Sequence, residues 1–142
     1  MDYKIIDFSK LKISELKKLC DYWFRQYLLS KVERSGNRIY CPIKKRYFNE
    51  SDIHVAHYYD RNVMCLRYSE DNCHLISAQS NMFDSQVPDK DFKSKHHKEY
   101  YNYLLESRGE KFIDNLLQES KNICIFASRD YISLIEKFRD GR

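Results

Sequence analysis

The sequence predicts an α+β fold in which a short β-hairpin is combined with several α-helices. Apolar residues recur at three- and four-residue spacing near the N-terminus and again in the last third of the chain, which is typical of helices. Two short runs rich in β-favouring residues, 39–41 and 53–59, lie between these segments. The length of 142 residues suits one modest hydrophobic core.

The first helix is expected over residues 14–32, with Ser14 as its N-cap. Further helices are expected from Ser94 to about residue 107, around residues 112–117, and after Ser128, which is placed to cap the last one. The short apolar run at 123–126 is expected to be buried. The apolar face of the first helix consists of Leu16, Leu19, Cys20, Trp23, Tyr27 and Leu28.

The middle of the chain carries the β-structure. Residues 39–41 and 53–59 are expected to pair as a hairpin, because the turn-forming stretch 42–46 follows the first of them. Residues 66–68 are expected to be extended, and 69–74 to form a polar loop. Ser77 is placed to cap a short helix over 78–84.

No repeat, low-complexity tract or flexible linker divides the chain, which contains only 3 Gly and 2 Pro. We therefore expect a single domain over residues 1–142. Its parts are an N-terminal helical segment at 1–36, a core of hairpin and helix at 37–86, and C-terminal helices at 87–142.

Charge and cysteine content limit the class of protein. The net charge of +4 gives weak support for a polyanionic partner. The five cysteines are odd in number and form no C-x-x-C pair, so we expect reduced thiols and neither a disulfide framework nor a four-cysteine zinc site. No signal peptide or membrane-length apolar run is apparent, so we expect a cytoplasmic protein without a membrane partner.

Three polar residues form a pattern that fits phosphodiester hydrolysis. His57 is on the second expected strand, Asn72 is in the loop after it, and Asn81 is on the short helix. Hydrolysis needs a base that works near neutral pH, which a histidine supplies, and oxygen ligands for a hard cation, which an asparagine supplies. The carbonyl of Asn72 is placed to orient the imidazole. The spacing alone does not exclude a structural histidine and turn-forming asparagines.

The surrounding residues resemble the NinG (Rap) family of phage recombination nucleases, which have a His-Asn-His (HNH) or ββα-metal core. The resemblance is carried by His54-Val-Ala-His-Tyr-Tyr, by Cys65-Leu-Arg-Tyr-Ser-Glu-Asp-Asn-Cys-His, and by Ser77-Ala-Gln-Ser-Asn. The segment from Trp23 and the region 100–117 are also similar, so the match covers roughly residues 17–120. It implies an endonuclease that cuts branched or single-strand-containing DNA, such as a Holliday junction, with Mg²⁺ or Mn²⁺.

The resemblance also implies roles for individual residues. His57 matches the general base, and Asn72 matches the middle asparagine that positions the base or the loop. Asn81 matches the metal ligand on the helix, and His74 and His54 are candidate second ligands, because Ala56 stands where many HNH enzymes carry a carboxylate. Arg67 matches an arginine that contacts phosphate or stabilises the loop.

The chain departs from the family at the positions of its two zinc knuckles. Cys41 matches one knuckle cysteine, but Lys44 stands where its partner would be, and Ser77 and Ser80 stand where the second pair would be. We therefore expect no structural zinc, and a core held by packing alone.

Two groups of cations are candidates for contacting DNA phosphates: Lys44, Lys45 and Arg46 at the hairpin turn, and Lys95 and Lys98 after the short helix. Each group taken alone is also compatible with an ordinary solvated surface. Symmetrical cutting of a four-way junction would favour a homodimer. The alternatives are a less selective HNH nuclease of packaging, restriction or homing, and a catalytically silent module that binds DNA or protein.

Overall fold

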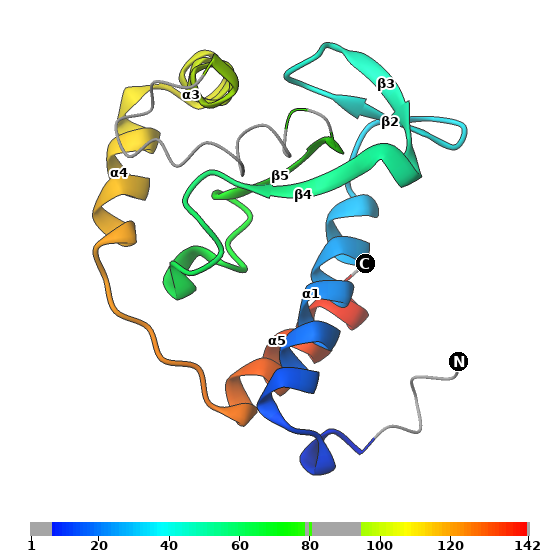
Figure 1. Cartoon of the computed structure of the whole chain (residues 1–142), viewed down its shortest axis with the longest axis vertical. Helices are drawn as coiled ribbons and strands as arrows, with labels where there is room; N and C mark the ends of the chain where they lie inside the picture. The colour runs from blue at the N-terminus through cyan, green and yellow to red at the C-terminus, as the bar shows by residue number, and fades with distance from the viewer. Residues whose placement is uncertain (1–6, 79, 81–94, 142) are drawn as a thin grey trace. The chain divides into compact units, whose positions relative to one another are not determined.

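The computed structural model describes residues 7–78, 80 and 95–141 (Figure 1). It combines α-helices with small antiparallel sheets, which confirms the predicted α+β class. The chain separates into two compact units, one made of Met1–Lys31 with Cys124–Arg142 and the other of Val32–Ile123. That all 142 residues fold as a single domain stays a prediction.

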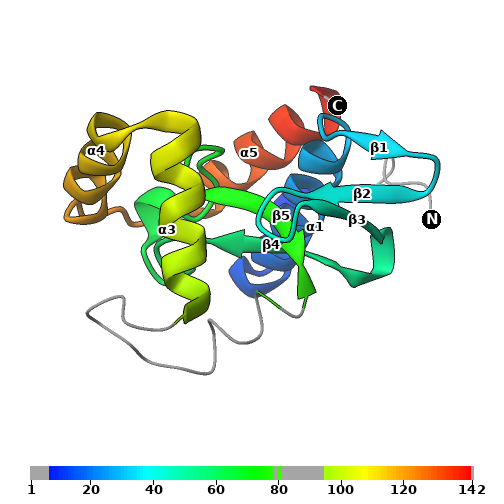
Figure 2. The same ribbon diagram turned by 90° about the horizontal axis from the view of Figure 1, so that it is seen from above.

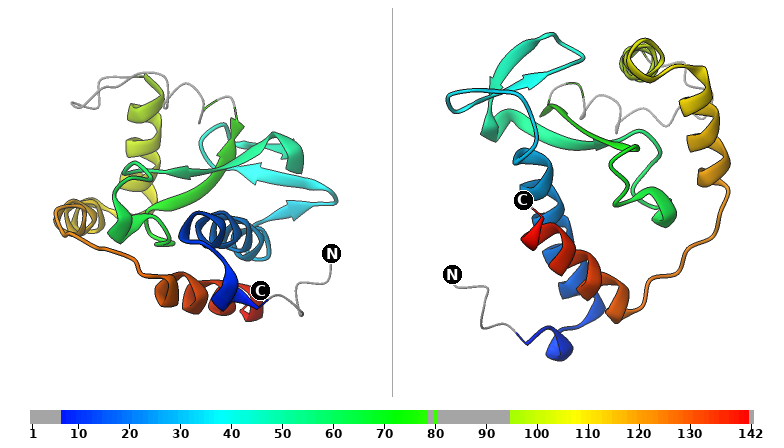
Figure 3. Two further views of the ribbon diagram at one scale, coloured as in Figure 1. Left: turned by 60° about the horizontal axis from the view of Figure 1, so that its bottom comes forward. Right: turned by 180° about the vertical axis from the view of Figure 1, so that it is seen from behind.

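The unit formed by the two ends of the chain is helical. Helix α1 spans Ile13–Leu29 and α5 spans Ser128–Asp140, and they lie side by side (Figure 3). The ring of Phe138 packs on Phe24 and Tyr27, with ring centroids 4.9 and 5.2 Å apart. The periodicity thus predicted both helices, although α1 begins before Ser14 and the residue capping α5 is Ala127.

The longer unit begins with a three-stranded antiparallel ribbon. Strands β1 (Arg34–Ser35), β2 (Arg38–Cys41) and β3 (Arg46–Asn49) occur in that order in the sheet. Gly36 makes the first turn with φ 61°, a conformation that glycine adopts without strain. Ile39 and Cys41 are fully buried, so one face of the ribbon is directed into the core.

A second, two-stranded sheet follows, and it corrects the predicted hairpin. Strand β4 (Ile53–His57) pairs with β5 (Cys73–Ser77), not with residues 39–41, whose partner is β3. The prediction was wrong because Tyr47-Phe48 is itself a β-favouring pair across a tight turn. In addition, the actual partner of β4 follows a long loop, and its first two residues, Cys73 and His74, fall in the segment 69–74 that was expected to be a polar loop.

The loop between β4 and β5 contains a short 3-10 helix, η4, over Met64–Leu66. Arg67 continues it with helical dihedral angles, so the extended conformation expected for residues 66–68 is wrong. Hydrogen bonds from Leu66 N to Val63 O and from Arg67 N to Met64 O form this turn. A run as short as Leu66-Arg67-Tyr68 carries no periodicity that could have distinguished the two conformations.

A helix begins directly after β5. Ala78 and Ser80 are helical, and the Oγ of Ser77 accepts a hydrogen bond from Ser80 N at 3.4 Å, as expected of an N-cap. Asn81 and the rest of the predicted helix lie outside the described residues. Helices α3 (Lys95–Arg108) and α4 (Glu110–Ser120) follow, and α3 lies across the β4–β5 pair (Figure 2).

Two further expectations are wrong. Ile123 and Ile125 are 91% and 89% exposed, although the run 123–126 was expected to be buried; such a short apolar run does not reveal its environment. The reduced thiols expected from the sequence are present at Cys20, Cys41 and Cys73, which are buried and free, but not at Cys65 or at Cys124, which are marked by disulfide bonding. Among the described helices, none has the length and apolar character needed to span a bilayer.

Candidate active site

His57 is the last residue of β4, and a main-chain carbonyl holds its side chain. The Nε2 atom lies 2.9 Å from the carbonyl oxygen of Arg67, in the loop that leads to β5. A carbonyl oxygen only accepts hydrogen bonds, so Nε2 carries the proton in the neutral ring. The basic lone pair of the neutral imidazole is therefore on Nδ1.

Asn72 closes the same loop. Its side chain is fully buried, its Oδ1 accepts a hydrogen bond from Tyr59 N at 2.8 Å, and its Nδ2 donates to the carbonyls of Tyr59 and Leu66 at 3.1 Å each. These bonds connect Asn72, at the end of the loop, to Tyr59 near its start and to Leu66 in its middle. The imidazole of His57 is oriented by the Arg67 carbonyl and not, as expected, by the amide of Asn72. Because Asn72 holds Leu66, the residue next to Arg67, it acts on His57 through the loop backbone.

The side chain of Arg67 also makes hydrogen bonds within the loop. The side chain is buried, with Nη1 donating to the carbonyl of Arg61 at 3.2 Å and Nε to the hydroxyl of Tyr68 at 3.2 Å. Of the two roles that the sequence suggested, these contacts favour stabilisation of the loop over contact with DNA phosphate.

Cys73 is the neighbour of His57 across the two strands. Antiparallel partners share a face of a sheet, and His57 pairs with Cys73, whose thiol also donates to the Arg67 carbonyl at 3.3 Å. Burial raises the pKa of the Cys73 thiol far above its usual value. The thiol therefore stays protonated and supplies neither a nucleophile nor a thiolate ligand.

His54 and His74 lie on the opposite face of the β4–β5 sheet from His57. The register pairs His54 with Ile76 and Ala56 with His74, and it runs without a bulge. Strand alternation therefore separates both histidines from His57. This placement argues against either one as a second ligand to a metal beside His57.

His74 connects the sheet to α3 instead. Its Nδ1 is hydrogen-bonded to the hydroxyl of Tyr100 at 2.6 Å, and its ring makes edge contacts with the rings of Tyr100 and Tyr103. Burial, with a smaller effect of the positive charge of Arg108, lowers the pKa of His74 to about 4. The imidazole is therefore neutral at physiological pH, and its contacts with Tyr100 and Tyr103 hold α3 against the sheet.

The candidate DNA-contacting cations differ in their surroundings. Lys44 forms an ion pair with Glu99 of α3 at 3.8 Å, whereas Lys45 and Arg46 are exposed. Lys98 is exposed on α3. Lys95 is the first residue of that helix, and its side chain lies outside the described part of the chain.

The metal ligands expected from the sequence do not come together in the described residues. Within residues 7–78, 80 and 95–141, there is no group of three or more His, Cys, Asp or Glu side chains that could hold a metal ion. Asn81, the principal expected ligand, lies outside that part of the chain.

The four positions matching the family's zinc knuckles do come together. The sulfur of Cys41 accepts hydrogen bonds from the main-chain N–H groups of Ser77 at 3.4 Å and Lys44 at 3.5 Å. The hydroxyl of Ser77 donates to that of Ser80 at 3.1 Å, and Cys41, Ser77 and Ser80 are all buried. Hydrogen bonds as well as packing therefore connect the ribbon to β5, which corrects the expectation of packing alone.

Cys73 and Tyr100 were not predicted from the sequence. The alternation of Cys73, His74 and Leu75, followed by the β-branched Ile76, was a signal that this segment is a strand, but only the register of the two strands places Cys73 opposite His57. Nothing in the sequence identified Tyr100 as the partner of His74, because helix and strand are far apart along the chain.

Comparisons with known proteins add no relative: no family model matches this chain, and no significant match was found among curated proteins or solved structures. The resemblance to the NinG family therefore remains a prediction from the residues quoted above.

Proposed function

We propose that this protein is a metal-dependent endonuclease that hydrolyses phosphodiester bonds in DNA, with His57 as its general base. The observation that carries the proposal is the bond between His57 Nε2 and the Arg67 carbonyl. It fixes the ring at the end of β4 and leaves the basic electron pair on Nδ1. The order of strand, Asn-closed loop, strand and helix start supports the same assignment.

The chemical step assigned to His57 is the removal of a proton from the attacking water. The water oxygen bonds to phosphorus as Nδ1 takes the proton, and the P–O bond to the sugar oxygen breaks, so that this oxygen leaves with the electron pair and takes a proton from solvent water. Mg²⁺ or Mn²⁺ would stabilise charge on the phosphate oxygens, with Asn81 as the proposed ligand. Among the described residues, no group of three or more His, Cys, Asp or Glu side chains supplies further ligands.

The finer features of the function come from the resemblance alone. They are selectivity for branched or junction DNA, a role in phage or prophage recombination, a possible homodimer, and the cytoplasm of the host cell. The disulfide-bonded Cys65 and Cys124 remove the argument for the cytoplasm that rested on reduced thiols. A less selective HNH nuclease would cut linear, nicked, flapped and four-way DNA at similar rates, whereas a structure-selective one would prefer the branched forms.

The test is a cleavage assay with the purified full chain on those four labelled DNA forms, in Mg²⁺, in Mn²⁺ and in EDTA. We expect cleavage that EDTA abolishes. His54→Ala is the matched variant, because His54 lies on the same strand as His57 but on the other face. It should keep most of the activity that His57→Ala loses. Binding without cleavage under every metal condition would instead establish the silent DNA-binding module.

A further inference from the structure

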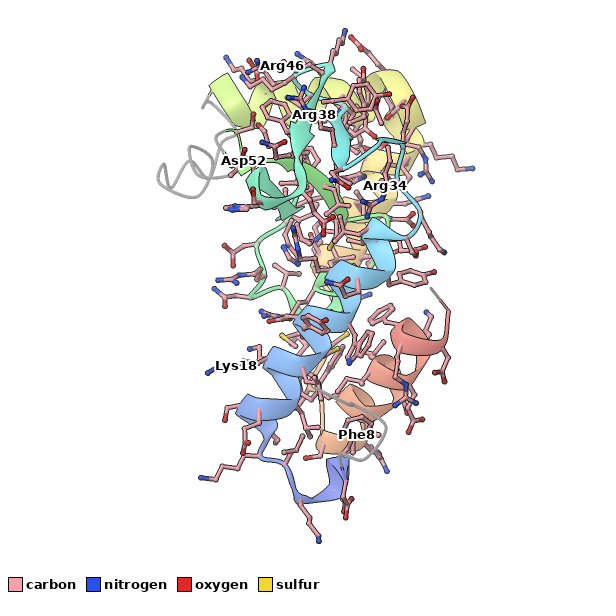
Figure 4. The ribbon with its side chains drawn as sticks, turned by 90° about the vertical axis from the view of Figure 1, so that its right-hand side faces the viewer. Phe8, Lys18, Arg34, Arg38, Arg46 and Asp52 are labelled. Carbon is pink, nitrogen blue, oxygen red and sulfur yellow. The ribbon has the colours of Figure 1, made fainter. Side chains whose placement is uncertain are left out.

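The β1–β3 ribbon carries cations that remain outside the proposed chemistry. Residues 34–49 contain Arg34, Arg38, Lys44, Lys45 and Arg46 and no Asp or Glu. Two of these cations have carboxylate partners: Arg34 pairs with Glu50 at 3.3 Å, and Lys44 pairs with Glu99. Within the described chain, Arg38, Lys45 and Arg46 are exposed and have no ion pair. Arg38 and Arg46 are labelled on the ribbon in Figure 4.

The face of the ribbon turned away from the core carries an aromatic pair. Tyr40 and Tyr47 are direct partners across β2 and β3, with ring centroids 5.3 Å apart in an edge-to-face arrangement. They lie opposite the fully buried Ile39 and Cys41 on β2, so they belong to the outer face. Both rings are partly exposed. The hydroxyl of Tyr47 donates to Glu33 at 3.1 Å, which fixes that ring.

Two of these three cations, Arg38 and Lys45, lie beyond the two ends of this aromatic pair. Arg38 shares the outer face with Tyr40, two residues away on β2. Lys45 lies at the other end, in the turn, with φ 56°. Arg46 pairs with the buried Cys41, and its guanidinium lies over the ring of Phe48, the partner of Ile39, so Arg46 belongs to the other side of the ribbon. At the rise of a strand, about 10 Å separates Arg38 from this end. Rings flanked by cations match a chain of alternating bases and phosphates.

We infer that the outer face of the β1–β3 ribbon binds an unpaired DNA strand, with Arg38 and Lys45 on its phosphates and Tyr40 and Tyr47 against its bases. Unpaired bases expose the flat faces that stack on aromatic rings, whereas bases in a duplex already stack on each other. A strand contacted by two cations should show a log–log salt slope of about −1.4, at roughly −0.7 per phosphate contact. The inference rests on the proposed nuclease function and deepens it by naming the form of DNA that the protein holds.

Binding is measured by fluorescence anisotropy of the full chain with a labelled oligothymidylate and with a blunt duplex of equal length, in EDTA so that no cleavage occurs. We expect tighter binding to the single strand. Arg38→Gln should weaken it and reduce the salt slope by about 0.7, and Tyr40→Ala should weaken it roughly tenfold while Tyr40→Phe keeps it. Lys18→Gln, which removes an exposed cation from α1, is the charge-matched control and should have little effect.

The inference is overturned if the duplex or an acidic peptide binds as tightly as the single strand, or if Arg38→Gln and Tyr40→Ala bind like Lys18→Gln. Equal urea midpoints of all variants exclude loss of folding, and Arg38→Glu provides a second, stronger test at the same exposed position. Cleavage measured separately distinguishes the two proposals. If the protein cleaves DNA but the ribbon variants bind single strands like the control, only the proposal for the ribbon is wrong. If the ribbon variants lose single-strand binding but the wild-type protein cleaves no DNA, only the proposed nuclease function is wrong.

Discussion

The Nε2 atom of His57 and the carbonyl oxygen of Arg67 are 2.9 Å apart, and this contact determines which nitrogen of the imidazole is basic. The carbonyl is supplied by a loop that Asn72 holds closed from inside the core. The imidazole is thus oriented by a main-chain acceptor, and the position of that acceptor depends on the buried amide of Asn72, which is hydrogen-bonded to the neighbouring carbonyl of Leu66.

Asn72→Ala should destabilise the protein by about 3 kcal/mol, because the substitution leaves the Tyr59 N–H and the carbonyls of Tyr59 and Leu66 without this partner in a buried region. Urea unfolding followed by circular dichroism measures the effect. Asn102→Ala, at an exposed position of α3, is the control and should change the free energy of unfolding by less than about 0.5 kcal/mol. Equal stability of the two variants would show that the loop does not depend on Asn72.

The free energy of unfolding should fall as the pH is lowered from about 6.5 to about 4 because of His74. Its pKa in the folded protein is lowered to about 4 from an ordinary 6.5, so between these values the unfolded chain binds the proton more readily. The stabilisation is complete above pH 6.5, and roughly 3 kcal/mol of it is lost once the pH is below the folded pKa. Urea titrations across this range should give a flatter profile for His74→Phe; an unchanged profile would exclude His74 as the source.

Removing metal ions should stop DNA cleavage without changing the thermal stability of the protein. The zinc-knuckle positions are linked by hydrogen bonds around Cys41, Ser77 and Ser80, so EDTA should leave the thermal midpoint unchanged. The same treatment should stop DNA cleavage, and Mg²⁺ or Mn²⁺ should restore it. A midpoint that falls with EDTA and returns with Zn²⁺ would contradict a zinc-independent core.

Ser77→Ala should lower stability by about 1–2 kcal/mol, because it removes the acceptor of the Ser80 N–H at the start of the helix and the partner of the Ser80 hydroxyl. Ser133→Ala, at an exposed site in α5, is the matched control. Thermal unfolding of the two variants gives the difference. A loss no greater than that of the control would mean that Ser77 does not cap this helix.

The sequence allowed prediction of the fold class and of the helices, because a repeating apolar face such as Leu16, Cys20 and Trp23 is a strong local signal. Strand pairing was predicted less well. The partner of β4 depends on where a long loop returns, and no local pattern contains that information.

The candidate site shows the same contrast between local features, which the sequence indicates, and long-range features, which it does not. His57 and Asn72 were selected as candidates from residue type and spacing, and both contact the loop between β4 and β5. The orienting group escaped prediction because it is the main-chain carbonyl of Arg67, and the identity of a side chain does not give the direction of a carbonyl. The resemblance suggested His74 as a metal ligand. The register of β4 and β5, which the sequence did not reveal, places it on the opposite face of the sheet from His57.

The central claim, that His57 is the base of a DNA-cleaving site, is tested most directly by the single-turnover cleavage rate of His57→Ala. The rate is measured on branched DNA in Mn²⁺, against wild-type protein with the same urea midpoint and DNA affinity. The account predicts a rate at least roughly a hundredfold below that of the wild type. Cleavage by His57→Ala at the wild-type rate would contradict it.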